Sequence, residues 1–397
     1  TFYSAKFNNQ FEATRRFLAS VSADIKPLGT EQFVISPTAY WHRDRDHYQL
    51  IRGKEGASNG GNWHRMDVYG AGINAHGSWL LGKTAVGMDV RKEHIVSTAY
   101  GDALPENEWM DISGSSRKFD HRGDRTNTSL FLEHNVILGG FTLSAGVLAN
   151  RNTGLDNRFR FYPGVDLSYR PNDSWKFYAS WNKALRVPTF TDLYTNNSVQ
   201  TGDLSLRPEK NSTFKIGSRY RRTGFEATLT GFYSHGTDII DWVYDTPDTR
   251  KYHAMNIGRL DNMGYSADAV FNIQELLPTA FVTRVKVGYA FIHQSHETDR
   301  DIYGSLYALE YLRHKATLQL DHRIWQRLSA SWAVRWQERM NHYTPYTKVD
   351  VKLQWTAPTY SLYVKADNIT CHRYYDLGSV LQPGIWVMAG GSITIGL

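Results

Sequence analysis

Residues 347–355 read Thr-Lys-Val-Asp-Val-Lys-Leu-Gln-Trp and alternate strictly between two kinds of side chain. The odd-numbered positions are mainly apolar, and every even-numbered position is charged or an amide. Residues 328–337 and 360–367 repeat the pattern. Period two over eight to ten residues predicts strands with one apolar and one polar face. A soluble antiparallel sheet also alternates, but its strands are usually only about five or six residues long.

The composition indicates where such strands would lie. Aromatic residues make up 14% of the 397 residues, with 24 Tyr and 12 Trp, although the mean hydropathy is only −0.48. Tyr and Trp accumulate where one end of a ring is in lipid and the other in water. No run reaches the roughly 18 apolar residues of a membrane-spanning helix. The chain is therefore expected to be all-β, a transmembrane antiparallel β-barrel, because a closed barrel also satisfies its backbone polar groups in lipid.

The connections between the expected strands alternate in length. Short links fall at 26–30, 80–83, 138–140, 171–174, 222–224, 274–279, 324–326 and 357–358. Long segments fall at 50–61, 101–121, 153–158, 188–210, 241–251, 296–304, 341–344 and 372–383. Short turns at one end and long extracellular loops at the other are typical of outer-membrane barrels, so segments 101–121 and 188–210 are expected outside the cell.

The pattern gives about 17 strands from near Phe11 to Leu397, in one domain that covers residues 1–397. Bacterial single-chain barrels have even strand numbers, and no signal peptide opens the chain, so the N-terminus is expected to be truncated. The apolar faces are expected to point to lipid, among them the side chains of Trp332, Val334, Trp336, Val349, Val351 and Leu353.

Charge and cysteine content exclude several classes of function. The formal net charge is +6, but Lys and Arg alternate with Asp and Glu along the strands, which does not favour nucleic-acid binding. The single Cys371 excludes an internal disulfide framework. No G-x-S-x-G elbow is present, and no catalytic constellation can be selected, so an enzyme is not expected.

Two motifs are interpreted as structural. Residues 77–84 match the phosphate-loop pattern G-x-x-x-x-G-K-[ST], but a strand pattern follows where that motif needs a helix, so we expect a hairpin. His42 and His47 are five residues apart, so on one strand they point to opposite faces and cannot share a metal.

Two segments carry a family resemblance. Residues 184–190 (Ala-Leu-Arg-Val-Pro-Thr-Phe) and 206–210 (Leu-Arg-Pro-Glu-Lys) resemble the mid-barrel signature of TonB-dependent receptors. Residues 364–369, 374–375 and 382–386 resemble the closing strands of that family. The signature residues are Arg186, Pro188, Arg207, Pro208, Glu209, Asn368, Pro383 and Gly384.

The resemblance implies an outer-membrane transporter of a Gram-negative bacterium. The complete member of the family has 22 strands, and an N-terminal plug, absent here, fills the lumen and contacts TonB. Outer-membrane lipids, and a surface lipoprotein that captures ligand, are the other implied partners. The family usually ends in Phe, and this chain ends in Leu397.

Within the family, residues 7–14, 63–70 and 87–95 resemble the cobalamin (vitamin B12) receptors of Bacteroides-type bacteria. Cobalamin or a related corrinoid is therefore the expected transported ligand, and no resident cofactor is implied. Ferric-siderophore and haem receptors share the scaffold, and fold alone does not select the ligand. A passive porin is the alternative from another class, and the family signatures argue against it.

Aromatic residues in the long segments are the candidate ligand-binding residues. Rings with a polar tip suit a bulky amphipathic ligand, although the upper aromatic girdle of a barrel would need the same residues. The candidates are Trp242, Tyr244, Tyr252, Tyr194, Trp109, Tyr100, Tyr303, Tyr343, Tyr374 and Tyr375. The first three are expected to cover the apolar face of the ligand.

Four acidic residues lie close together at 238–248 and could bind Ca²⁺. They are Asp238, Asp241, Asp245 and Asp248. Their spacing is irregular, so a solvated acidic loop is the alternative, and no other metal site is expected.

Overall fold

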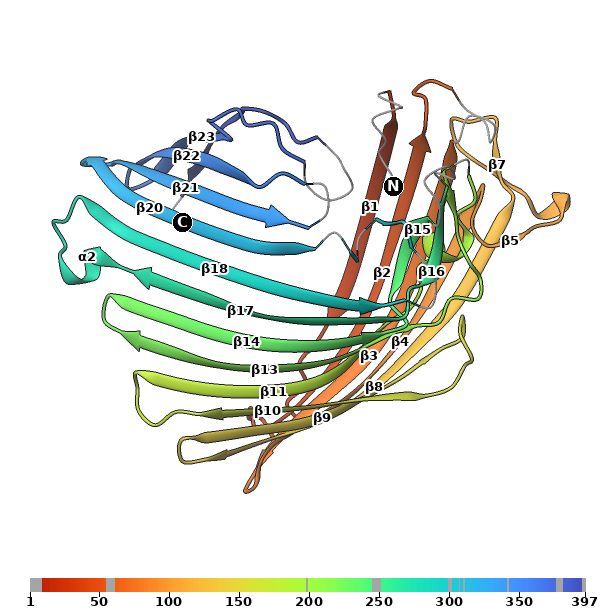
Figure 1. Ribbon diagram of the computed structural model, residues 1–397. Coiled ribbons are helices and arrows are strands. Elements are labelled where there is room, and N and C mark those ends of the chain that lie inside the picture. Colours follow the sequence, from red (N-terminus) through yellow and green to blue (C-terminus); the bar gives the residue numbers. More distant parts are fainter. Residues whose placement is uncertain are drawn as a thin grey trace.

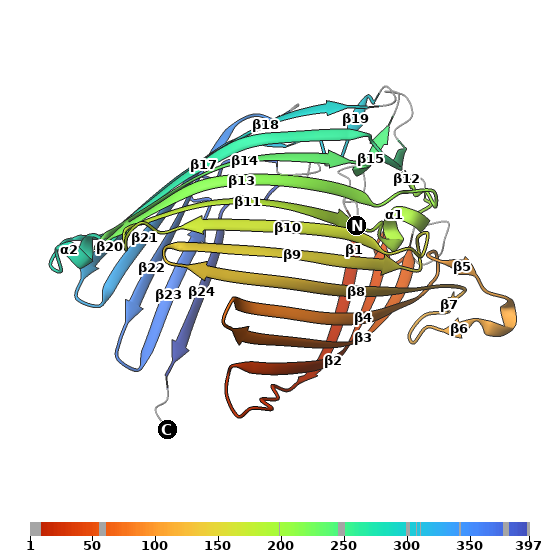
Figure 2. The same cartoon turned by 90° about the horizontal axis from the view of Figure 1, so that it is seen from below.

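The strands form one curled antiparallel sheet (Figures 1 and 2). The computed structural model describes residues 9–54, 61–197, 199–244, 251–298, 302–306, 308–309, 311–340, 343–375 and 381–394. The sheet has 18 strands, of which the two-residue β5 is an accessory beside β8, and each long strand pairs with the next long strand in the chain. Within the described residues, the edge strands β1 and β24 are not paired with each other.

The long strands are between 8 and 18 residues in length. They are β1 (Phe11–Ser22), β2 (Phe33–Gln49), β3 (Asn62–Trp79), β4 (Gly82–Ser97), β8 (His121–Leu138), β9 (Phe141–Asn152), β10 (Arg160–Tyr169), β11 (Trp175–Arg186), β13 (Glu209–Arg222), β14 (Phe225–Thr237), β17 (Arg259–Phe271), β18 (Val282–Glu297), β20 (Leu312–Trp325), β21 (Leu328–Arg339), β22 (Tyr346–Thr356), β23 (Tyr360–Asp367) and β24 (Trp386–Ile393). The all-β prediction and the count of about 17 strands are confirmed.

The connections alternate as the sequence predicts. At one end of the sheet, here the turn end, tight turns join the strands, and Gly139 between β8 and β9 adopts φ 56°, which glycine accepts without strain. The segment 274–279 differs from a simple turn, because it contains the short helix α2 (Ile273–Leu276). The opposite end, here the loop end, carries the described parts of the long segments (Figure 2).

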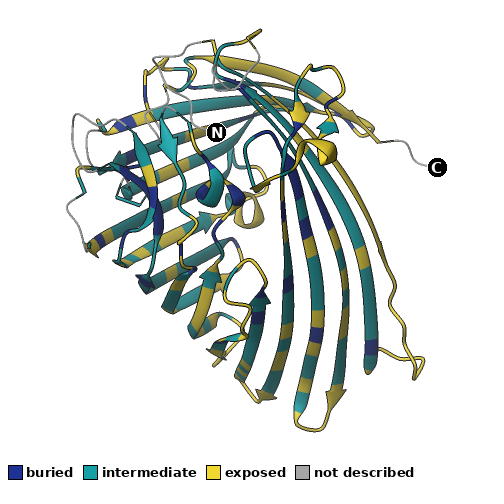
Figure 3. Ribbon diagram, turned by 90° about the vertical axis from the view of Figure 1, so that its right-hand side faces the viewer, coloured by how far each residue is buried: buried dark blue, intermediate teal, exposed yellow. Residues whose placement is uncertain are grey.

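The long segments at the loop end, which the sequence predicts as loops, contain short strands and helices. They hold β5 (Asp102–Ala103), the 3-10 helix η2 (Glu106–Glu108), β6 (Met110–Asp111), β7 (Lys118–Phe119), α1 (Phe190–Tyr194), β12 (Gln200–Thr201), β15 (Ile240–Tyr244), β16 (Tyr252–Asn256) and β19 (Gly304–Ser305). Figure 2 shows β5, β6, β7, α1, β12, β15 and β19 at the loop end. Short strands are missed by periodicity because two to five residues hold too few repeats of the pattern. Most buried apolar residues lie at this end, and Figure 3 shows little burial elsewhere.

The register shows which side chains share a face. Trp332 of β21 is opposite Val351 of β22, and Val351 is in turn opposite Ala366 of β23. Directly opposed residues point to the same side of the sheet, so the apolar positions form one continuous outward face. The intervening polar positions, such as Lys352 opposite Ser331, form the concave face that is here named the lumen face. The pairings agree with the predicted division of faces.

Both motifs that were interpreted as structural lie in strands and turns. The phosphate-loop pattern spans the end of β3, a two-residue turn and the start of β4. His42 lies near Asp44 on the lumen face, whereas His47 stacks on Trp63 at 3.5 Å on the outward face. In the described part of the chain, no helix is long and apolar enough to cross a membrane.

Candidate functional site

The loop end is closed in part by a second, small sheet that three different loops build together. This loop sheet has the strand order β12-β16-β15-β19, in which β15 pairs with both β16 and β19. Its strands come from the segments between β11 and β13, between β14 and β17, and between β18 and β20. Because three loops share one hydrogen-bonded sheet, they are held as a unit.

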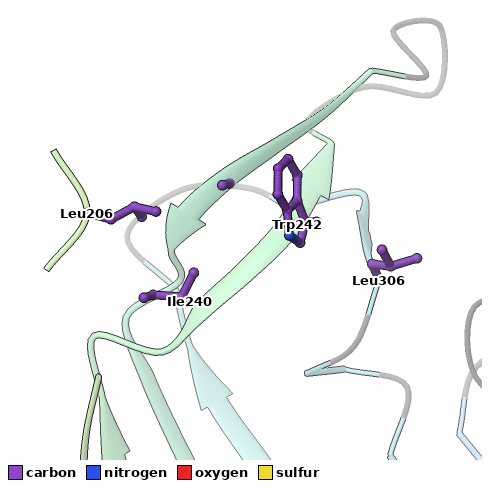
Figure 4. Packing of buried hydrophobic residues seen from close by; sticks show 5 residues of the cluster. Leu206, Ile240, Trp242 and Leu306 are labelled. Atoms are coloured by element: carbon purple, nitrogen blue, oxygen red, sulfur yellow. The ribbon is translucent and has the colours of Figure 1, made fainter. Parts of the chain in front are cut away.

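An apolar core holds the loop sheet together (Figure 4). Trp242 of β15 lies in this core and is only 5% exposed. The other buried members are Leu206, Ile240, Ala254 and Leu306, and Leu193 and Tyr252 pack against them. Truncating a buried Trp to Ala typically costs about 3–5 kcal/mol. Trp242 therefore supports the loop sheet in addition to any contact it makes with a ligand.

Asp241 fastens β19 and the residues after it to β15. Its carboxylate accepts hydrogen bonds from the Ser305 hydroxyl and from the Ala308 backbone N–H at 2.8 Å, and its side chain is buried.

Asp238, the first of the four acidic residues predicted as a calcium site, is paired with Arg207 and Lys210. Asp245 and Asp248 lie outside the described residues. Among the described residues, no group of three or more His, Cys, Asp or Glu could hold a metal ion. Calcium binding stays a prediction that the geometry of Asp241 does not favour.

The segment between β11 and β13 bends into the lumen and is anchored there by Arg125 of β8. The Arg125 guanidinium donates to the Pro188 carbonyl at 2.7 Å and lies 4.6 Å from the ring centre of Phe190. The ring of Phe190 packs where Gly123 leaves room, because a Cβ on Gly123 would lie 2.9 Å from the Phe190 ring. Thr189 caps α1 in a capping box with Asp192.

The mid-barrel signature residues brace the base of these loops. Arg186 at the end of β11 donates to Glu209 at 2.6 Å, to Asp192 at 3.2 Å and to the Ile240 carbonyl. Glu209 also accepts the Ile240 backbone N–H. One guanidinium thus connects β13, α1 and β15. Pro188 and Pro208 are both buried beside this brace, and Arg207 pairs with Asp238.

The C-terminal signature performs a similar role between β23 and β24. Asn368 adopts φ 53°, which Asn tolerates better than most residues. Its amide donates to the carbonyls of His372 and Pro383, and its side-chain oxygen accepts the His372 N–H. A Cβ on Gly384 would lie 3.2 Å from the Cys371 sulfur. The sequence resemblance identified these residues, but it did not indicate their structural roles.

A cavity of about 440 Å³ lies at the loop end on the lumen side. Its strand lining comes from the lumen face of β1–β4 and β8, and its loop lining from α1 and its neighbours. The residues with rings or polar groups include Arg16, Asp44, Asp46, Tyr48, Asn62, His64, Tyr100, Arg125, Thr191, Thr195 and Trp242. This mixture of rings, donors and acceptors can hold an amphipathic ligand by stacking and hydrogen bonds.

Tyr100 joins the strand and loop parts of the cavity lining. Its ring stacks on His64 at 4.1 Å, and its hydroxyl accepts a hydrogen bond from Thr195. Burial raises the pKa of Tyr100, so its hydroxyl stays protonated at neutral pH. A ligand in the cavity would therefore meet a neutral, fixed phenol.

The ten aromatic candidates do not form one patch. Tyr244 of β15 contacts Tyr252 of β16 and Tyr303 at 5.2 and 5.6 Å, and Tyr303 is 62% exposed. Tyr374 is buried against Tyr346 at 4.4 Å. Of the remainder, Tyr100 and Trp242 line the cavity, Tyr194 stacks on Phe190, and Trp109, Tyr343 and Tyr375 do not line it.

The cavity residues on the strands, such as Tyr48, Asn62 and His64, are not among the residues predicted from the sequence to bind ligand. The alternation in β2 and β3 was a usable signal, because lumen-facing positions near the loop end are the ones a ligand would meet. The inward course of the α1 segment has no comparable signal, since a loop can bend to either side.

A known protein family and several solved structures are similar to this chain. The family described as "TonB dependent receptor-like, beta-barrel" matches residues 2–369. The chain belongs to this family. It is therefore part of a bacterial outer-membrane receptor barrel, and the family consists of transport receptors and not of enzymes. No curated protein matches the sequence.

Solved structures of an iron transporter, a ferric enterobactin receptor and a copper transporter share the fold. The FrpB iron transporter from Neisseria meningitidis, in its apoprotein form, superposes with a TM-score of 0.73 at 17% identity over 97% of this chain and 65% of that one. A mutant of the ferric enterobactin receptor PfeA from Pseudomonas aeruginosa gives 0.71 at 15% identity, over 96% and 61%. The copper transporter OprC gives 0.73 at 14% identity, over 98% and 67%. The chain thus spans less than two thirds of the length of the first two proteins.

Proposed function

We propose that this TonB-dependent receptor takes up a bulky metal chelate of the ferric-siderophore class through the outer membrane. The cavity at the loop end carries the proposal, because it combines rings with hydrogen-bonding groups under a sheet built from three loops. Three proteins of similar fold are named for iron, ferric enterobactin and copper. Coupling to TonB would supply the energy, as the family name implies.

Cobalamin uptake is the second candidate. The resemblance of residues 63–70 and 87–95 to cobalamin receptors favours it, and both stretches lie in β3 and β4, which line the cavity. None of the three similar proteins is named for cobalamin. For this reason the siderophore class is placed first.

The experiment is an equilibrium titration of the complete receptor with a ferric catecholate siderophore, a ferric hydroxamate siderophore, haemin and cyanocobalamin. Saturable binding of one ferric siderophore, with the other ligands at least about a hundredfold weaker, is the expected result. Tight binding of cyanocobalamin alone would replace the siderophore proposal by the second candidate. Binding of none of the four would refute both.

A pair of aromatic substitutions tests whether the cavity is the site. Tyr48→Ala removes a ring that lines the cavity, whereas Trp109→Ala removes an exposed ring that does not. Truncating an aromatic hot spot costs about 2 kcal/mol or more, which is about a thirtyfold loss of affinity. We expect that loss in Tyr48→Ala only, with heat-modifiable barrel migration unchanged in both variants. Equal affinities would place the site elsewhere. Trp242→Ala is a poor probe, because it also removes the core of the loop sheet.

A further inference from the structure

Three arginines stand side by side on the outward face near the loop end of β1, β2 and β3. Arg15 is directly opposite Arg45, and Arg45 is directly opposite Arg65. Opposed residues in adjacent antiparallel strands have their Cβ atoms about 4.5–5.5 Å apart and point to the same face. Like charges in such positions repel each other and destabilise the sheet. This arginine row therefore needs a source of negative charge.

The protein supplies little of that charge. Asp67 accepts Arg43 at 2.6 Å and lies 3.6 Å from Arg65, so one carboxylate serves two guanidiniums. Arg15 and Arg45 are exposed, and no carboxylate of the described residues pairs with either of them. The Nε of Arg65 is buried without a hydrogen-bond partner in the described structure. Among the described residues, the three arginines of the row and Arg43 are thus accompanied by one paired carboxylate, that of Asp67. The excess of positive charge makes this surface suited to binding an anion.

The position of the row relative to the membrane follows from the outward face of β2. Along this face the side chains change from apolar Ile35 to aromatic Trp41 and then to Arg43 and Arg45. Aromatic residues of a barrel mark the interface between hydrocarbon and headgroups. Arg45 is four residues beyond Trp41, or roughly 13 Å along the strand. The arginine row therefore lies at the level of the lipid headgroups, on the side of the long loops.

We propose that Arg15, Arg45 and Arg65 bind the phosphate groups of lipopolysaccharide in the outer leaflet of the outer membrane. A guanidinium offers a planar pair of donors that fits phosphate oxygens in a bidentate manner. Across three strands the row spans about 10 Å, so a phosphate can lie between each pair of neighbours. Below the row, Phe17 and Trp41 pack together at 5.0 Å and face the acyl chains. The assignment rests on the outer-membrane location and not on the identity of the transported ligand.

The test is the binding of diphosphoryl lipid A to the complete protein in detergent, measured by native mass spectrometry. The double variant Arg15→Gln with Arg45→Gln is compared with Arg16→Gln, which changes the next residue of the same strand on the lumen face. Arg16 is paired with Asp44 there. We expect the affinity of the double variant to fall by about tenfold or more and that of Arg16→Gln to change by less than about twofold. Unchanged affinity in the folded double variant, or an equal loss in Arg16→Gln, would overturn the proposal.

Two further measurements make the result independent of the folding of the variants. Dephosphorylated lipid A should bind the unmodified protein about tenfold more weakly or worse, because the acyl chains alone do not engage the guanidiniums. Equal binding of the two lipids would overturn the proposal. Inorganic phosphate at millimolar concentration should not displace diphosphoryl lipid A. Complete displacement would make the row a site for free phosphate and would overturn the lipid assignment.

Discussion

At the scale of single residues, the two faces of a strand differ in what they tolerate. Val351 of β22 belongs to the outward face, opposite Trp332 and Ala366. Ala333 of β21 belongs to the lumen face and is opposite Asp350. An arginine at the first position would enter lipid, whereas an arginine at the second would lie beside a carboxylate.

Val351→Arg is therefore expected to lower the free energy of unfolding by about 2–4 kcal/mol if the position is near the middle of the membrane. Ala333→Arg is the control and should change it by less than about 1 kcal/mol. Urea unfolding in lipid vesicles measures both. Equal destabilisation would show that the faces were assigned incorrectly.

Two arginines of the family signature have different structural roles. Arg186 and Arg207 belong to the same signature, but Arg186 connects three partners, whereas the Arg207 side chain is 66% exposed and pairs with Asp238, which Lys210 also contacts. Removal of Arg186 takes a donor from three acceptors and therefore costs more than removal of Arg207, after which Asp238 keeps Lys210.

At the scale of elements, the brace formed by Arg186 connects β11, β13, α1 and β15. Arg186→Ala leaves Asp192 and Glu209 without this donor, at a cost of about 1–3 kcal/mol that falls on the loops and not on the sheet. The loops should then open locally more often. We expect proteolysis within residues 188–208 to be about tenfold faster or more, with barrel migration unchanged.

Arg207→Ala serves as the matched control for the brace. It removes an ion pair in which the guanidinium is exposed and the carboxylate keeps Lys210 as a partner. Such a pair is worth about 0–1 kcal/mol, so the cleavage rate should change by less than about fivefold. Cleavage that is equally fast in both variants would mean that Arg186 does not hold the loops. Limited proteolysis of outer-membrane preparations gives both rates.

At the scale of the whole molecule, the strand ends define two sides of the membrane. Gly114, in the segment between β6 and β7, and Gly139, in the turn between β8 and β9, both have positive φ and open space around the position of a Cβ. Both sites can therefore accept an inserted peptide without a clash. They lie on opposite ends of the sheet.

Epitope tags inserted at these two glycines test the sidedness. The tag at Gly114 should be stained on intact cells, because long loops of outer-membrane barrels are extracellular. The tag at Gly139 should be stained only after the outer membrane is permeabilised. The reverse result would invert the topology and would also place the arginine row on the periplasmic side.

The large sheet can be predicted from the amino-acid sequence alone. Strands such as β21 and β22 are long enough to show period two several times, and the short turns fix how each strand meets the next. Neighbouring strands in the chain are neighbours in the sheet, so register and faces follow from local information. The signature residues also predicted the family, because they form short motifs that are contiguous in the sequence.

The arrangement of the loops cannot be predicted in this way, because it depends on contacts between distant segments. β12, β15 and β19 are short and come from three separate segments, so no local pattern predicts that they join one sheet with β16 or that Trp242 lies in its core. The inward course of the α1 segment depends on Arg125, which is more than 60 residues away in the chain. The arginine row likewise exists only through the register of three strands. Periodicity records which face a side chain takes, whereas contacts between distant segments depend on packing that the local sequence does not encode.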